Sequence, residues 1–184
     1  MDNESQPEGI ESAARPVVRV LLQARFPEAG AADDTYDMSP PMAVVYLSRD
    51  DLRGDKGIDG VQPAAWRQLV RLGGEPVGLS DVVVDPSEGP QFTQLNYGPF
   101  VKSVADVVAR PERSVDTFNG QVRMLEIPAL YTVALWYDGP KENLVIPLDP
   151  APEPLDAGRE YPVDDFLEIV RRMARDATPG PALV

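Results

Sequence analysis

The chain has 184 residues, 43% hydrophobic and 26% charged, which suits one globular domain with a sizeable core and is short for two. The 30 acidic and 17 basic residues leave a formal net charge of −13, which disfavours direct binding to nucleic-acid phosphates and to anionic membranes. Cysteine and histidine are both absent, which excludes disulfides, thiolate nucleophiles, cysteine-ligated zinc and the Ser-His-Asp relay. Any catalysis would have to use Asp, Glu, Lys, Tyr, Ser or an oxygen-ligated metal.

The two ends of the chain have the composition of tails. Residues 1–14 are polar and acidic without periodicity, and we expect a disordered acidic tail there. Residues 177–184 predict a flexible C-terminal tail, which leaves residues 15–176 as a single α+β domain. The N-terminus lacks the basic and apolar runs of a signal peptide, and no apolar stretch is long enough for a membrane span. We therefore expect a cytoplasmic protein.

The first predicted element covers residues 16–26 (PVVRVLLQARF). Its valines favour a strand, with Val18, Val20 and Leu22 on one face. An amphipathic helix starting at Pro16 is the competing interpretation.

The next two elements are a strand and a helix. The nearly continuous apolar run at residues 42–48 (MAVVYLS) is typical of a buried strand. Residues 62–72 predict a helix, because Pro63 suits a first helical turn and Gly73-Gly74 supplies a stop. One face of that helix would carry Ala65, Trp66, Leu69 and Val70.

A second helix is predicted over residues 99–109. Its apolar residues recur with a period of 3.6: Phe100, Val101, Val104, Val107 and Val108. Three strand-like runs follow at residues 121–127, 130–137 and 143–148, and the turn at 138–142 (DGPKE) predicts a hairpin between the last two. Pro128 breaks the first pair, and Pro147 places the last strand at or near a sheet edge.

The last predicted element is a helix over residues 162–175. Aspartates 164 and 165 lie in its first turn and three arginines in its last, as the helix dipole favours. Its apolar face consists of Phe166, Leu167, Val170, Met173 and Ala174. The fold class expected from these elements is α+β: a mainly antiparallel sheet with about three helices packed on it.

Two acidic loops could be considered as metal sites. The stretch DKGIDG at residues 55–60 resembles the start of an EF-hand loop, but Gly57 stands at the third ligand position and Trp66 at the twelfth. A glycine-rich turn is the better interpretation. Asp33, Asp34 and Asp37 form the other cluster, and their spacing could hold Mg²⁺ or Ca²⁺, although a solvated loop is the commoner outcome.

Other candidate chemistry is weak. Glu126 interrupts an apolar run, so it is either on a solvated face or edge, which we favour, or a buried carboxylate with a raised pKa. Ser80 has neither the G-x-S-x-G spacing nor a histidine to activate it. No glycine-rich nucleotide motif occurs, so no cofactor is expected.

An aromatic group on the strand at residues 130–137 is the candidate partner-binding site: Tyr131, Trp136 and Tyr137. Because both faces of this strand are apolar, burial in the core is the competing and commoner interpretation.

These observations favour a non-catalytic protein-interaction module, an accessory, regulatory or immunity-type factor that docks on a protein partner, basic in charge, through its acidic surface. The alternative is a carboxylate-based enzyme, with or without a metal, or a small-ligand binder; it requires a deep pocket lined by acidic and aromatic residues. Mimicry of nucleic acid by rows of carboxylates is disfavoured, because many acidic residues fall in predicted tails and loops.

Overall fold

The computed structural model of the protein describes residues 7–28, 35–54, 58 and 61–176. The helices are α1 (Ile10–Arg25), α2 (Arg49–Arg53), α3 (Pro99–Val108) and α4 (Val163–Asp176), with single 3₁₀ turns η1 (Pro111–Arg113) and η2 (Pro128–Leu130). The strands are β1 (Tyr36–Met38), β2 (Met42–Tyr46), β3 (Ala65–Leu72), β4 (Glu75–Asp85), β5 (Gly89–Asn96), β6 (Gln121–Ile127), β7 (Thr132–Asp138), β8 (Asn143–Pro147) and β9 (Tyr161–Pro162).

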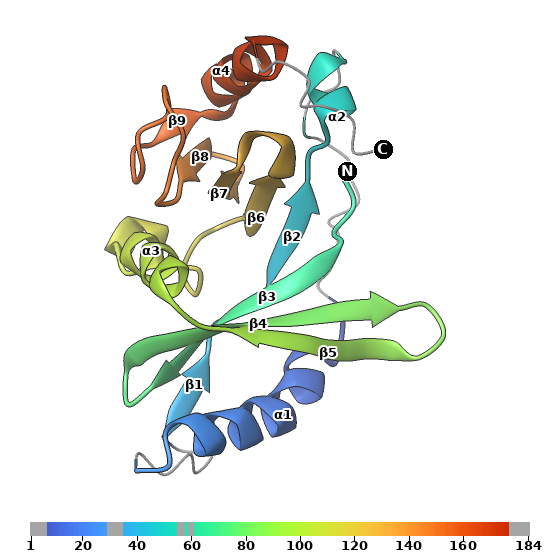
Figure 1. Ribbon diagram of the computed structural model, residues 1–184, viewed down its shortest axis with the longest axis vertical. Helices are drawn as coiled ribbons and strands as arrows, with labels where there is room; N and C mark the ends of the chain where they lie inside the picture. The colour runs from blue at the N-terminus through green and yellow to red at the C-terminus, as the bar shows by residue number, and fades with distance from the viewer. Residues whose placement is uncertain (1–6, 29–34, 55–57, 59–60, 177–184) are drawn as a thin grey trace, which may run out of the picture.

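The nine strands among the described residues belong to one sheet with the order β5-β4-β3-β2-β6-β7-β8-β9, and β1 pairs with β3 (Figure 1). Every pairing is antiparallel except the one between β2 and β6. That parallel pair joins the N-terminal strands to the C-terminal ones. The fold is therefore α+β, as the sequence predicts, with a larger sheet than the three predicted C-terminal strands alone would form.

Helices cover both faces of the sheet. Along β2, Ala43 packs with residues of α1 and Val45 with residues of α4, whereas the intervening Val44 packs with residues of α3. Since side chains alternate between the faces of a strand, α1 and α4 share one face and α3 lies on the other. Figure 1 shows α1 beside β4 and β5 at one end and α4 beside β8 and β9 at the other. Among the described residues, no helix combines the length and apolar character needed to cross a membrane.

Several predicted elements are confirmed. The strand at 42–48, the helix at 99–109, the three strands from residue 121 onward and the C-terminal helix correspond to β2, α3, β6–β8 and α4. The β7–β8 turn closes with the Gly139 amide donating to the Glu142 carbonyl at 2.8 Å. Pro128 starts the 3₁₀ turn between β6 and β7, and Pro147 lies on the next-to-last strand of the sheet.

The strand predicted at residues 16–26 is wrong, because the segment belongs to α1. The helix begins at Ile10, so residues 10–14 are helical rather than part of the expected tail. Its buried positions are spaced by four residues, Ile10, Ala14, Val18 and Leu22, which is the period of a helix. Val20, placed by the strand prediction on the same face as Val18, is 59% exposed.

The helix predicted at residues 62–72 is also wrong, because residues 65–72 form β3. This strand is paired on both edges, with β4 on one side and with β1 and β2 on the other, and it buries side chains on both faces, which hides the two-residue alternation of a strand. Gly73 and Gly74 have φ values of 59° and 87° and connect Leu72 to its partner Glu75. Two adjacent residues with positive φ are typical of a two-residue hairpin turn, so the pair of glycines turns the chain between strands rather than ending a helix.

Candidate functional site

In the part of the chain that the structure describes, three surface hollows border the segment that runs from α3 through η1. Their volumes are about 230, 330 and 420 Å³, compared with about 300–1,000 Å³ for typical small-molecule sites. The smallest lies between η1 and the β7–β8 turn, the second between α3 and the loop before β9, and the largest between Arg113, β8 and β9. Glu142 lines both the smallest and the largest.

Arg113 occupies the centre of this region and is buried, with its side chain 7% exposed. It donates two hydrogen bonds to the carboxylate of Glu160, at 2.9 and 2.8 Å, and one to Glu142 at 2.6 Å. Its guanidinium lies 5.5 Å from the ring centre of Tyr137, whose hydroxyl donates to the Arg113 carbonyl at 2.8 Å. One arginine thus joins η1, the β7–β8 turn and the start of β9.

The electrostatics of this cluster oppose acid catalysis by Glu160. The hydrogen bonds from Arg113 lower the pKa of Glu160, and the same contacts raise the pKa of Arg113. Burial raises the pKa of the Tyr137 hydroxyl. Glu160 therefore stays ionised at neutral pH and Tyr137 stays neutral, whereas a general acid needs a carboxyl group with a raised pKa.

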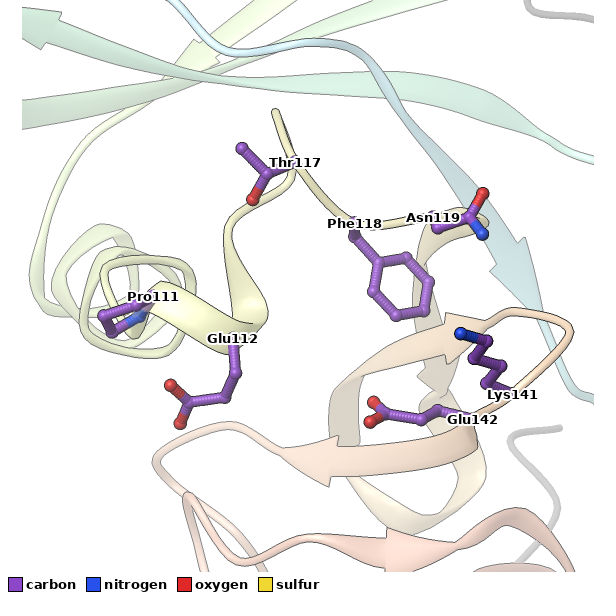
Figure 2. Close-up of a pocket in the computed structure, with 7 residues that line it drawn as sticks. All are labelled: Pro111, Glu112, Thr117, Phe118, Asn119, Lys141 and Glu142. Carbon is purple, nitrogen blue, oxygen red and sulfur yellow. The ribbon is translucent and has the colours of Figure 1, made fainter.

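The smallest hollow has a polar rim and an aromatic wall. Figure 2 shows Glu112 extending from η1 and Lys141 and Glu142 extending from the β7–β8 turn, with the Phe118 ring between them. The Phe118 ring packs edge-on against Tyr137, with ring centres 5.1 Å apart. The hollow thus combines one cationic and two anionic side chains around an apolar surface.

An acidic strip runs through residues 149–168, which contain seven acidic residues and a single basic one, Arg159. All seven acidic residues are exposed: Asp149, Glu153, Asp156, Glu160, Asp164, Asp165 and Glu168. The backbone between them is held in place, since Leu155 and Tyr161 are buried and the Gly158 amide donates to the Pro147 carbonyl at 2.8 Å. The strip is an ordered, acid-rich segment in which Asp156, Glu160 and Glu168 are paired with arginines.

A second charged network crosses the middle of the sheet on the face that carries α3. Arg67 donates to both carboxylate oxygens of Asp81, at 2.6 and 2.8 Å, and to Glu126 at 2.8 Å. Asp81 also accepts a hydrogen bond from Gln94 at 2.7 Å. Glu126 lies on the interior strand β6, so the predicted edge position is wrong, and its side chain is partly exposed at 19%. Its partner Arg67 is the reason a carboxylate can occupy this place.

The predicted aromatic site is divided by the fold. Trp136 and Tyr137 are 1% and 0% exposed and form part of the core, so they are not available to a partner, and the competing core interpretation holds for both. Tyr131 is 89% exposed, because it follows η2 with a φ of 50° instead of lying in the strand. It lies beside α4, since η2 packs against that helix.

The candidate metal residues fall mostly outside the described part of the chain. Asp33, Asp34, Asp55 and Asp59 are not described; Asp37 lies on β1, 3.6 Å from Arg71. Within the described ranges, no three acidic side chains are grouped as metal ligands would be. Ser80 is fully buried in β4.

Sequence reasoning missed both arginine centres. Arg67 and Asp81 each interrupt an apolar run, which is a usable signal for a buried ion pair. Arg113 stands in a polar stretch with no such signal.

No model of a known protein family, no curated protein and no solved structure shows significant similarity to this chain. The interpretation of the site therefore depends on its chemistry.

Proposed function

We propose that the chain is a non-catalytic protein-interaction module, acting in the cytoplasm as an accessory, regulatory or immunity-type factor, that docks on a basic partner protein through the acidic strip. The observation that supports this most directly is the display of seven exposed acidic residues and one basic residue along an ordered backbone. A surface of one sign attracts a partner of the opposite sign and accelerates its association.

An aromatic side chain on another part of the surface is a second candidate contact. Tyr131 projects its ring into solvent directly after η2, which packs against α4. Exposed tyrosines are common binding anchors, because a large rigid ring loses little conformational entropy on burial. A partner with a basic rim and a pocket for one aromatic ring would fit this surface.

A capture experiment with two charge-matched variants tests the proposal. The strip variant carries Glu153→Gln, Asp164→Asn and Asp165→Asn, and the control variant carries Glu28→Gln, Glu75→Gln and Glu88→Gln, which are equally exposed but lie outside the strip. Wild type and control should recover the same stoichiometric partner from native lysate, less of it as NaCl rises. The strip variant should recover about tenfold less.

Equal recovery by both variants would contradict the proposal, as would the absence of a partner at low salt. Far-UV circular dichroism of both variants establishes that the fold is intact. Adding Tyr131→Ala separates the aromatic contribution, because this exposed ring can be removed without opening a cavity.

The alternative of a carboxylate-based enzyme would use the largest hollow, which brings Glu142, Glu160 and Tyr161 together. Two of its features speak against acid–base work there. Arg113 pairs with both glutamates, and the pKa of Glu160 is lowered rather than raised.

A further inference from the structure

The strand β5 is an edge strand without charged side chains. Within the described residues it is the last strand on its side of the sheet and pairs only with β4. Its sequence, GPQFTQLN, contains no acidic or basic residue, in a chain where about a quarter of residues are charged. Edge strands of monomeric proteins are usually protected by charged side chains. Apart from Pro90 near the hairpin tip, β5 offers backbone amides and carbonyls for pairing with another strand.

The helix α1 runs alongside this edge for its whole length. Gly9, just before the helix, lies against Pro90 at the start of β5, and Phe26, just after it, packs on Tyr97 with ring centres 6.4 Å apart. A helix of this length spans about 24 Å and the strand about 26 Å, so the two elements are matched in extent.

The flank of α1 that faces the edge is apolar and is exposed from Val17 onward. Arg15 marks the opposite flank, because its guanidinium stacks over Tyr36 of β1, on the inner side of the sheet. Half a helical turn away from Arg15 runs a stripe at i, i+4, i+7 and i+11 spacing. It consists of Ala13, Val17, Val20 and Ala24. Val17 is 38% and Val20 59% exposed.

From these two features we propose that the chain forms a symmetric homodimer, in which β5 pairs antiparallel with β5 of a second copy and the apolar stripes of the two α1 helices pack together. A two-fold axis perpendicular to the sheet generates this arrangement: it continues the sheet across the interface and puts both helices on the same face. The inference concerns a surface other than the acidic strip and does not rest on the proposed function.

The local chemistry of this surface suits a second copy as the occupant. The net charge of −13 on each chain opposes association over most of the surface, but β5 and the stripe contain no charged residue, so two copies can meet there without opposing acidic side chains. Antiparallel pairing also brings the hairpin tip of one copy, with Asp85 and Glu88, to the end of the other copy where Arg25 stacks on Tyr97 at 4.9 Å. The side chains brought together at each end of the interface are therefore opposite in charge.

Light scattering on the full chain, coupled to size-exclusion chromatography, tests the dimer. The wild type should show twice the chain mass of 20.1 kDa. Val17→Glu and Val20→Glu should each weaken dimerisation at least about tenfold, because each puts a carboxylate from both copies into an apolar contact. Val83→Glu is the matched control: Val83 is also 38% exposed but lies on the opposite face of the sheet, and it should leave the mass unchanged.

Amide hydrogen exchange gives a second readout, with circular dichroism to confirm folding. Exchange in residues 89–96 should slow as the wild-type concentration rises and should not change with concentration in Val20→Glu.

A mass of 20.1 kDa at all concentrations up to about 100 µM would overturn the proposal. So would a dimer that survives both α1 variants, or one that Val83→Glu dissociates equally. The dimer should persist or strengthen with added NaCl, whereas docking through the acidic strip should weaken, so the two proposals fail independently.

Discussion

Arg67 shows what a single charged residue does in the middle of this sheet. Its side chain and that of Asp81 are 10% and 4% exposed, and their contact at 2.6 Å replaces the water that both groups lose on folding. Arg67→Met should lower the free energy of unfolding by about 3–5 kcal/mol, because Asp81 would remain buried without its cation. Urea denaturation followed by fluorescence of Trp66 and Trp136 measures the change.

The same strand contains the control for this prediction. Arg71 pairs with Asp37 at 3.6 Å, and the two side chains are 27% and 65% exposed. Arg71→Met should therefore cost no more than about 1 kcal/mol. Adding Asp81→Asn to Arg67→Met should recover part of the loss, since the more deeply buried of the two carboxylates then carries no charge and only the partly exposed Glu126 is left without its cation. An equal cost for the two arginine variants would show that burial does not govern these pairs.

Individual charges were visible in the sequence, but their pairing was not. Arg67, Asp81 and Glu126 all interrupt apolar runs, which marks each as unusual. The residues that Arg67 joins are 14 and 59 positions away, and only the strand order brings β3, β4 and β6 within reach. The hydrophobic pattern of one segment contains no information about such distant partners.

At the scale of elements, the Arg113–Glu160 pair ties η1 to β9. The pKa of Glu160 is lowered by hydrogen bonds from Arg113, so this contact stabilises the fold above the pKa of the unfolded glutamate and is lost as pH falls through the lower, folded value. As pH falls below about 4.3, the Tm of Glu160→Gln should decrease less steeply than the Tm of the wild type. Thermal unfolding across a pH series measures this decline.

Glu75→Gln is the matched control for the pH series, because Glu75 is exposed at a hairpin turn. Its profile should follow that of the wild type. If Glu160→Gln also follows the wild type, the contact with Arg113 does not contribute to acid unfolding.

Helices and strands could be predicted where a single hydrophobic period dominates the segment. The predictions failed where burial on both faces or the geometry of a turn hides that period. The stripe of α3 and the face of α4 appear directly in the sequence, and both helices form where expected. In α1 the valines favour a strand. The segment is nevertheless a helix, with Pro16 inside it, and its buried residues from Ile10 to Leu22 recur every four positions. After β3, a pair of glycines fits both a helix stop and a hairpin turn, and the pairing of Leu72 with Glu75 decides for the hairpin.

At the scale of the whole molecule, the predicted elements indicated the α+β class and the composition indicated the acidic character, but neither could predict which surface carries the charge. The acidic strip combines a proline-rich loop with the first turn of α4, and its order comes from two buried side chains, Leu155 and Tyr161, that a loop-like sequence conceals. Net charge is a property of the whole chain, whereas a docking surface requires that the charges be held on one side.

The net charge itself has a measurable consequence for stability. Thirteen unmatched negative charges repel one another in the compact state, while exposed pairs such as Lys102–Asp106 stabilise by at most about 1 kcal/mol each. Raising NaCl from about 10 to about 150 mM shortens the screening length from about 30 to about 8 Å, so the repulsion should weaken more than the pairs do. Tm should rise by about 2–4 °C per kcal/mol of repulsion relieved. The strip variant, with three fewer negative charges, should show a smaller rise.

Tm should be compared at a protein concentration where light scattering finds the same mass in both salts, because dimerisation would add its own salt dependence. A Tm that falls with NaCl would mean that ion pairs outweigh repulsion, and that the negative charge is compensated locally over most of the surface.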